Sequence, residues 1–186
     1  MGGVDKGALT VGGRPLWRMV VERLAPQGRT LAVLAPAAPS WLAQANGAVL
    51  IADTGAARGP AAGLLAALQL LEKEQGPGAL LLTAPVDAPF LPLDLFEKLD
   101  ALRSQAAAPA AVVRHAAGLH PVFGLWQAGC SREVEAALGE ERALHRIAAR
   151  AGAVECSAWE GESPDPFANL NSPEDVAAAE AFLRRL

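Results

Sequence analysis

The chain has 186 residues and a formal net charge of −4, and hydrophobic residues make up 52% of it while charged residues make up 19%. These values fit a single domain over residues 1–186 with a buried core, and they exclude intrinsic disorder as a description of the whole chain. The acidic balance argues against binding of duplex nucleic acid or of an anionic membrane surface, although one bound nucleotide needs only a few local positive groups.

Cysteine content and hydropathy indicate the compartment. Cys130 and Cys156 are too few for a disulfide framework, so we expect free thiols in a reducing environment. No apolar run approaches the roughly 18 residues of a membrane-spanning helix. Asp5 and Lys6 stand where a signal peptide would need an apolar stretch. The sequence therefore predicts a cytoplasmic protein that does not enter a membrane.

Short apolar runs alternate with stretches of helical periodicity along most of the chain. Apolar runs of this kind suit strands that are covered on both faces, as in a parallel sheet. The expected strands are 30–34, 48–51, 79–83, 111–114, 122–126 and 154–158. The expected helices are 16–24, 40–45, 60–73, 93–107, 133–138, 144–151 and 173–185. This alternation predicts an α/β fold with a mainly parallel sheet, helices on both faces, and a small antiparallel element within 111–126.

Two aspartates and one helix start follow the ends of predicted strands. Asp53 and Asp87 each come shortly after an apolar run, and Gly59 with Pro60 opens the helix that follows Asp53. Because ligands of open α/β sheets bind beyond the carboxyl ends of the strands, we expect one edge that binds a phosphate and Mg²⁺. Each signal is weak alone, since an aspartate after a strand is as often a turn former or a helix cap.

Other sites are not indicated. The sequence contains no P-loop, no G-x-G-x-x-G fingerprint and no nucleophile elbow. His115 and His145 have no partner at metal-ligand spacing, and no cluster of histidine and cysteine indicates zinc.

Six short motifs occur in an order that is jointly specific. They are M-G-G-V-D-K at 1–6, G-R-P-L at 13–16, G-P-A-A-G at 59–63, P-V-D-A-P-F at 85–90, H-P-V-F-G-L at 120–125 and N-L-N-S-P-E-D at 169–175. In this order they resemble the molybdenum cofactor guanylyltransferases, and the resemblance covers nearly the whole chain. It implies a Rossmann-like nucleotidyltransferase fold. It also implies an enzyme that uses Mg²⁺ to transfer GMP from GTP to the terminal phosphate of molybdopterin, with pyrophosphate as the second product.

The resemblance also implies roles for individual residues. Asp87 corresponds to the catalytic aspartate that binds the metal and the nucleotide, and Lys6 to the catalytic lysine that contacts the GTP phosphates. Asp53 corresponds to an aspartate that helps to bind the nucleotide. Three further residues are expected to line the active site on the pterin side or at a metal: His120, Asn169 and Asn171. Molybdoenzyme chaperones and other cofactor-biosynthesis proteins are the implied protein partners.

Two features depart from the family's pattern. Ala35 stands where the family often has an asparagine that helps to hold guanine, so guanine selectivity is less firmly implied. Met1 falls inside the family's opening motif, so the resemblance implies that the first strand, the glycine loop and its arginine are absent. We therefore expect a poor catalyst in which the strands beside the missing one lack ladder partners.

Two alternatives stay open at the level of the sequence. One is a nucleotidyltransferase of the same fold with another product, either a molybdopterin cytidylyltransferase or an enzyme that makes a sugar nucleotide. The other is a non-catalytic protein that binds the cofactor without transferring a nucleotide. The motif at 59–63 favours the guanylyl type by resemblance.

Overall fold

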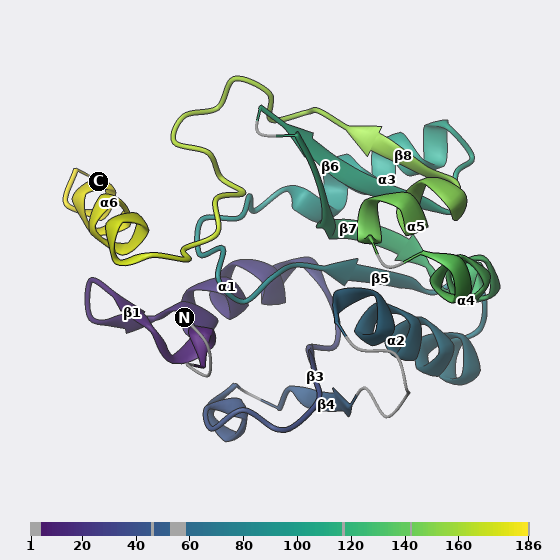
Figure 1. Ribbon diagram of the computed structural model, residues 1–186, viewed down its shortest axis with the longest axis horizontal. Coiled ribbons are helices and arrows are strands. Elements are labelled where there is room, and N and C mark those ends of the chain that lie inside the picture. The colour runs from purple at the N-terminus through teal and green to yellow at the C-terminus, as the bar shows by residue number, and fades with distance from the viewer. Residues whose placement is uncertain (1–4, 46, 53–58, 117, 142, 186) are drawn as a thin grey trace.

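The computed structural model describes residues 5–45, 47–52, 59–116, 118–141 and 143–185 (Figure 1). A sheet of four strands forms its centre, in the order β5-β7-β6-β8. Beside it lie a parallel pair, β3 with β4, and a small antiparallel pair, β1 with β2. The strand bounds are β1 Thr10–Val11, β2 Arg14–Pro15, β3 Ala32–Ala35, β4 Val49–Ala52, β5 Leu80–Thr83, β6 Ala110–His115, β7 Gly118–Gln127 and β8 Ala153–Cys156.

The strand directions match the expected α/β class. Strands β6 and β8 are parallel, while β7 runs antiparallel to both β5 and β6. It follows that β5, β6 and β8 point the same way and that β7 is the antiparallel element. The predicted strand at 122–126 is too short, because β7 begins at Gly118 and includes Pro121.

Helices cover both faces of the central sheet (Figure 1). Their bounds are α1 Leu16–Leu24, α2 Pro60–Gln75, α3 Leu95–Gln105, α4 Ser131–Glu140, α5 Leu144–Arg150 and α6 Pro173–Leu183. Along β6, Ala111 and Val113 pack in the core that contains α3, while Ala110 and Val112 pack in the core that contains α2, α4 and α5. The alternation follows from the two-residue period of a strand. The prediction of helices on both faces is confirmed.

Helix α2 joins the two main sheets. It begins at Pro60. The preceding Gly59 has a φ of +102°, a value that residues other than glycine rarely adopt. The helix packs against β3 and β4 and also against β5. Among the described residues, β3 and β5 each have a single ladder partner. The pair β3-β4 and the four-stranded sheet are therefore separate sheets, and both pack against α2.

The segment at 40–45 does not form the predicted α-helix. Only a 3-10 turn is present, η3 (Leu42–Gln44), closed by hydrogen bonds from Gln44 N to Trp41 O and from Ala45 N to Leu42 O. Pro39 before it and Gly47 after it leave too few residues to offset the cost of nucleating an α-helix.

The C-terminal helix returns to the N-terminal part of the chain (Figure 1). Helix α6 packs beside β1, and Glu180 Oε1 accepts a hydrogen bond 3.3 Å long from Gly12 N. A separate apolar cluster of Val11, Leu16, Met19, Leu170 and Ala179 fixes this arrangement. It brings the N-L-N-S-P-E-D segment to the same side as Lys6. Within the described residues, none of the helices is both long enough and apolar enough to span a membrane.

Candidate active site

Asp87 lies in the turn that follows β5, at the carboxyl end of that strand. Asp87 is only 7% exposed, so its carboxylate is buried in this turn. The backbone carbonyl of Asp87 accepts a hydrogen bond 2.8 Å long from Leu170 N. This bond ties the turn after β5 to the segment that precedes α6, and it brings two of the sequence motifs into contact.

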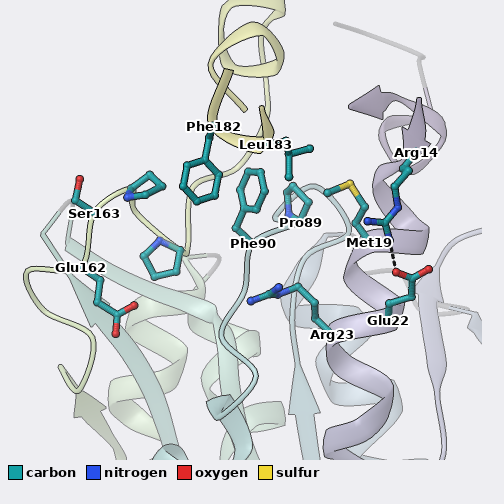
Figure 2. A pocket seen from close by; sticks show the side chains of 12 residues that line it. Arg14, Met19, Glu22, Arg23, Pro89, Phe90, Glu162, Ser163, Phe182 and Leu183 are labelled. Atoms are coloured by element: carbon teal, nitrogen blue, oxygen red, sulfur yellow. Dashed lines mark hydrogen bonds and ion pairs between the residues drawn. The ribbon is translucent and has the colours of Figure 1, made fainter. Parts of the chain in front are cut away.

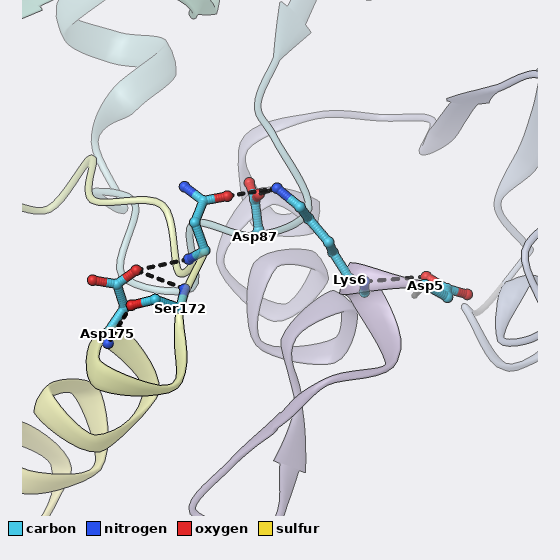
Figure 3. A network of polar contacts seen from close by, with 7 residues as sticks. Asp5, Lys6, Asp87, Ser172 and Asp175 are labelled. Carbon is cyan, nitrogen blue, oxygen red and sulfur yellow. Dashed lines mark hydrogen bonds and ion pairs between the residues drawn. The ribbon is translucent and has the colours of Figure 1, made fainter. Parts of the chain in front are cut away.

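Lys6 reaches both of these segments from the N-terminal turn (Figure 3). It begins the 3-10 turn η1 (Lys6–Ala8), which Asp5 caps by accepting a hydrogen bond from Gly7 N. The Lys6 Nζ atom lies 3.1 Å from Asp87 Oδ2 and 2.5 Å from Asn171 Oδ1. Because the Lys6 side chain remains 40% exposed, its ammonium group is accessible to an anionic ligand.

Asn171 is held by the start of α6. Asp175 Oδ2 accepts hydrogen bonds from Asn171 N and Ser172 N, each 2.9 Å long, and Ser172 Oγ accepts one from Asp175 N (Figure 3). This is a capping box, in which side chains satisfy the free amides of the first helical turn. The hydrogen bonds, first of all the one from Asn171 N, lower the pKa of the Asp175 carboxyl. The cap therefore positions Asn171 as well as the helix.

Lys6, Asp87 and Asn171 together form one small polar cluster from three distant segments. It presents an ammonium group between a buried carboxylate and an amide oxygen. Carboxylate and amide oxygens are ligands that suit Mg²⁺, which usually takes one or two protein carboxylates and completes its shell with phosphate and water. No group of three or more histidine, cysteine or acidic side chains that would hold a metal alone occurs among the described residues. The cluster suits an ion that is shared with a bound phosphate.

The other predicted site residues lie apart from this cluster. Asn169 is exposed, and in the described chain no hydrogen bond joins it or His120 to the cluster. Asp53 falls outside the described residues. The prediction that its carboxylate lies close to Asp87 therefore concerns a residue outside the described part of the chain.

His120 belongs to an aromatic cluster on β7. Its ring packs beside Phe123 and Phe167. Burial lowers the pKa of His120; Asp165 acts in the opposite direction, and His115 adds to the lowering. His115 is itself buried, and its Nδ1 lies 3.1 Å from Asp165 Oδ1 without hydrogen-bond geometry. These histidines contact the 157–171 loop that leads to Asn171.

The cysteines are not placed for catalysis. Cys130 and Cys156 are both free, as the sequence predicts, and both are buried. Burial, with a contribution from Glu133, raises the pKa of the Cys130 thiol to about 11. A thiol with this pKa stays protonated at neutral pH and is a poor nucleophile.

A cavity of about 560 Å³ lies beside the chain that follows Asp87 (Figure 2). It is bounded by α1, the chain after Asp87, the 162–166 loop and the end of α6. Phe90 and Phe182 meet there edge to face, with ring centroids 5.3 Å apart. Arg14 is paired with Glu22, and Arg23 donates to Leu91 O, so both guanidinium groups are already bound. Of the predicted site residues that the structure describes, none lines this cavity.

Sequence reasoning missed the residues that support the cluster. Ser172 and Asp175 form a capping box, and the S-x-x-D spacing before an apolar helix is a signal that could have identified them. The sequence shows Asp5 as a charged residue of the motif at 1–6, but not that it caps the turn that carries Lys6. The contact between Leu170 and Asp87 has no local signal, because it joins backbone atoms of distant segments.

Known proteins with similar sequence and structure agree with the motifs. The family model described as a MobA-like NTP transferase domain matches residues 1–154. A molybdenum cofactor guanylyltransferase from Cereibacter sphaeroides is 42% identical, over 100% of this chain and 91% of its own. One from Rhodopseudomonas palustris (strain HaA2) is 37% identical, over 100% of this chain and 87% of its own.

The fold has a counterpart among solved structures. Molybdopterin-guanine dinucleotide biosynthesis protein A from Archaeoglobus fulgidus superposes with a TM-score of 0.74 at 21% identity, over 99% of this chain and 93% of that one. At this identity the likeness supports the Rossmann-like nucleotidyltransferase fold alone. The sequence relatives carry the assignment further: the chain belongs to the molybdenum cofactor guanylyltransferases, a family of nucleotidyltransferases.

Proposed function

We propose that this protein transfers GMP from GTP to the terminal phosphate of molybdopterin, forming molybdopterin guanine dinucleotide and releasing pyrophosphate. Membership of the guanylyltransferase family supports this reaction over the cytidylyl and sugar-nucleotide alternatives. The observation that carries the proposal is the position of the Lys6 ammonium group, between the buried carboxylate of Asp87 and the amide of Asn171 at the carboxyl end of β5.

The transfer exchanges one phosphoanhydride bond for another. A molybdopterin phosphate oxygen forms a bond to the α-phosphorus of GTP, and the bond from that phosphorus to the bridging oxygen of the β-phosphate breaks. Catalysis of such a displacement depends on positioning and on neutralising negative charge, without a covalent protein nucleophile. Lys6 is suited to neutralise the triphosphate oxygens, because its exposed ammonium group is already oriented before a nucleotide arrives.

Asp87 and Asn171 are suited to hold Mg²⁺ together with the phosphates. Both offer hard oxygen donors within hydrogen-bond distance of the Lys6 ammonium group. A bound Mg²⁺ would supply further neutralisation of the triphosphate charge. Because these oxygens are the hydrogen-bond partners of Lys6, a substrate phosphate that binds the ammonium group would replace them.

Three further assignments are part of the proposal. Asp53 would help to bind the nucleotide, through the base or through the ribose hydroxyl groups. Asn169 and His120 would serve the pterin side. The 157–171 loop supports the last assignment, because it packs on His120 through Phe167 and also leads to Asn171.

The proposed setting is the cytoplasm. The product would pass to molybdoenzyme chaperones or to other proteins of cofactor biosynthesis, and the whole chain would act as one domain.

The proposal is tested by supplying molybdopterin and Mg²⁺ with GTP, CTP or ATP, and by following pyrophosphate release and the mass of the dinucleotide. We expect the guanine dinucleotide to form fastest. Formation of the cytosine dinucleotide at an equal or higher rate would contradict the guanylyl assignment, and absence of pyrophosphate with every nucleotide would favour the non-catalytic alternative. Lys6→Ala should reduce the rate with GTP. Lys73→Ala is the matched control, because Lys73 lies exposed at the far end of α2.

A further inference from the structure

The turn that carries Lys6 contacts a stacked pair of tryptophans, Trp17 and Trp41. The sequence motifs do not predict that these two residues pack together. Trp17 on α1 and Trp41 before η3 stack with ring centroids 5.3 Å apart and an interplanar angle of 2°. Each is 6% exposed, and Val21, Val33, Ala48 and Val86 pack around them. Val86 directly precedes Asp87, so the same cluster also packs against the segment that carries Asp87.

Asp5 links the tryptophan pair to the turn. Its Oδ1 atom accepts a hydrogen bond 3.1 Å long from the Trp41 indole Nε1 and a second, also 3.1 Å long, from Gly7 N. Gly7 lies against the Trp41 ring, where a Cβ atom would come within 2.8 Å of Trp41 Nε1. The close approach leaves no room for a side chain, so ring and backbone fix the path of residues 5–7.

We propose that Asp5 and Trp41 are positioning residues for Lys6. Their hydrogen bond, supported by the stack on Trp17, fixes the turn from which the Lys6 ammonium group reaches Asp87 and Asn171. Both N–H donors reach one oxygen, Asp5 Oδ1, so an uncharged amide oxygen at this position would accept the same two hydrogen bonds. The importance of this position for GMP transfer rests on the proposed function, whereas the positioning itself can be measured without any nucleotide.

The chain has three lysines, Lys6, Lys73 and Lys98, so the reactivity of each can be read separately. The probe is brief acetylation with acetic anhydride, followed by mass spectrometry of the peptides. Lys73 is exposed and serves as the internal standard, while Lys98 is paired with Asp94 and packs over Trp159 and reports on the rest of the fold. In the wild-type chain, Lys6 should react more slowly than Lys73.

Three variants separate the acceptor atom from the charge and the ring. Asp5→Ala removes the acceptor, and Trp41→Phe keeps an aromatic ring on Trp17 but removes the N–H donor. Trp41→Phe should raise acetylation of Lys6 relative to Lys73 by about fivefold, the factor that corresponds to one lost hydrogen bond. Asp5→Ala should raise it by at least as much, because it removes the acceptor of both hydrogen bonds. Asp5→Asn keeps the acceptor oxygen, so its ratio should stay close to that of the wild-type chain.

The proposal is overturned if the ratio is unchanged in Asp5→Ala and in Trp41→Phe, or if Lys98 becomes reactive in parallel with Lys6, since that pattern marks a general loss of structure. A large change in Asp5→Asn would also overturn it, because charge would then be the property that matters. In the same variants the KM for GTP should follow the Lys6 ratio. If the wild-type chain releases no pyrophosphate, the proposed function fails, and the acetylation ratios still decide the positioning.

Discussion

The three residues of the candidate site come together only in the folded chain. Lys6 is separated by 81 residues from Asp87 and by 165 from Asn171, yet its ammonium group contacts both side chains. Each residue could be selected from the sequence, because each stands in a short motif. Their contact could not be derived from local pattern, and neither could the hydrogen bond of Asp5 to Trp41, whose segment has the composition of a short helix.

His120 gives a prediction at the same scale. Burial lowers its pKa below the ordinary value of 6.5, so the folded chain resists protonation more than the unfolded chain does. As the pH falls below about 6.5, the unfolded chain takes up the proton first, and the free energy of unfolding decreases.

Urea unfolding at pH 7.5 and at pH 5.5 checks this. His120→Gln should show a smaller decrease in stability between the two pH values than the wild-type chain. His145→Gln is the control, because His145 is exposed on α5. An equal decrease in His120→Gln and in the wild-type chain would show that His120 does not contribute.

At the scale of elements, most strands and helices were predictable because the apolar periodicity is strong. Strand β7 is the instructive exception, since proline in the middle of a strand argues against a central position. The pairing of β6 with β7 shifts between Val112, which faces Gly124, and Val113, which faces His120. Pro121 lies in the residues that this irregularity leaves without a partner, so its missing N–H costs no ladder hydrogen bond.

The capping box of α6 gives the second prediction. Ser172→Ala removes the acceptor for Asp175 N, and loss of an N-cap of this kind costs about 1 kcal/mol of stability. Because Asp175 also holds Asn171 N, the substitution should raise the KM for GTP as well. Chemical denaturation and steady-state kinetics measure the two effects. Ser157→Ala, at an exposed serine outside the helices, is the control, and equal effects in both variants would contradict the role of the cap.

At the scale of the whole molecule, the central sheet carries two separate cores, one on each face. Leu125 is completely buried in the core that contains α3, whereas Leu93 is 61% exposed. The apolar run at 111–114 predicts a strand that is buried on both faces, and the alternate packing of β6 residues in the two cores agrees with it. The association of α6 with β1 was not predictable, because it depends on contacts between the two ends of the described chain.

The third prediction tests the core that contains α3 and Leu125. Leu125→Ala should lower the free energy of unfolding by about 2–5 kcal/mol, because it removes buried methyl groups and leaves a cavity. Leu93→Ala should change it by less than about 0.5 kcal/mol. Denaturant titration measures both, and similar losses in the two variants would contradict the position of the core.

The turnover number of Asp87→Asn for pyrophosphate release from GTP, in the presence of molybdopterin and Mg²⁺, tests the candidate site most directly. The substitution keeps the size of the side chain and removes the charge that faces Lys6 and is proposed to hold Mg²⁺. The account predicts a loss of at least about 100-fold with an unchanged fold by circular dichroism. Asp100→Asn, which removes a surface partner of Arg103, should keep the wild-type rate. A folded Asp87→Asn variant that turns over at close to the wild-type rate would contradict the assignment of the site.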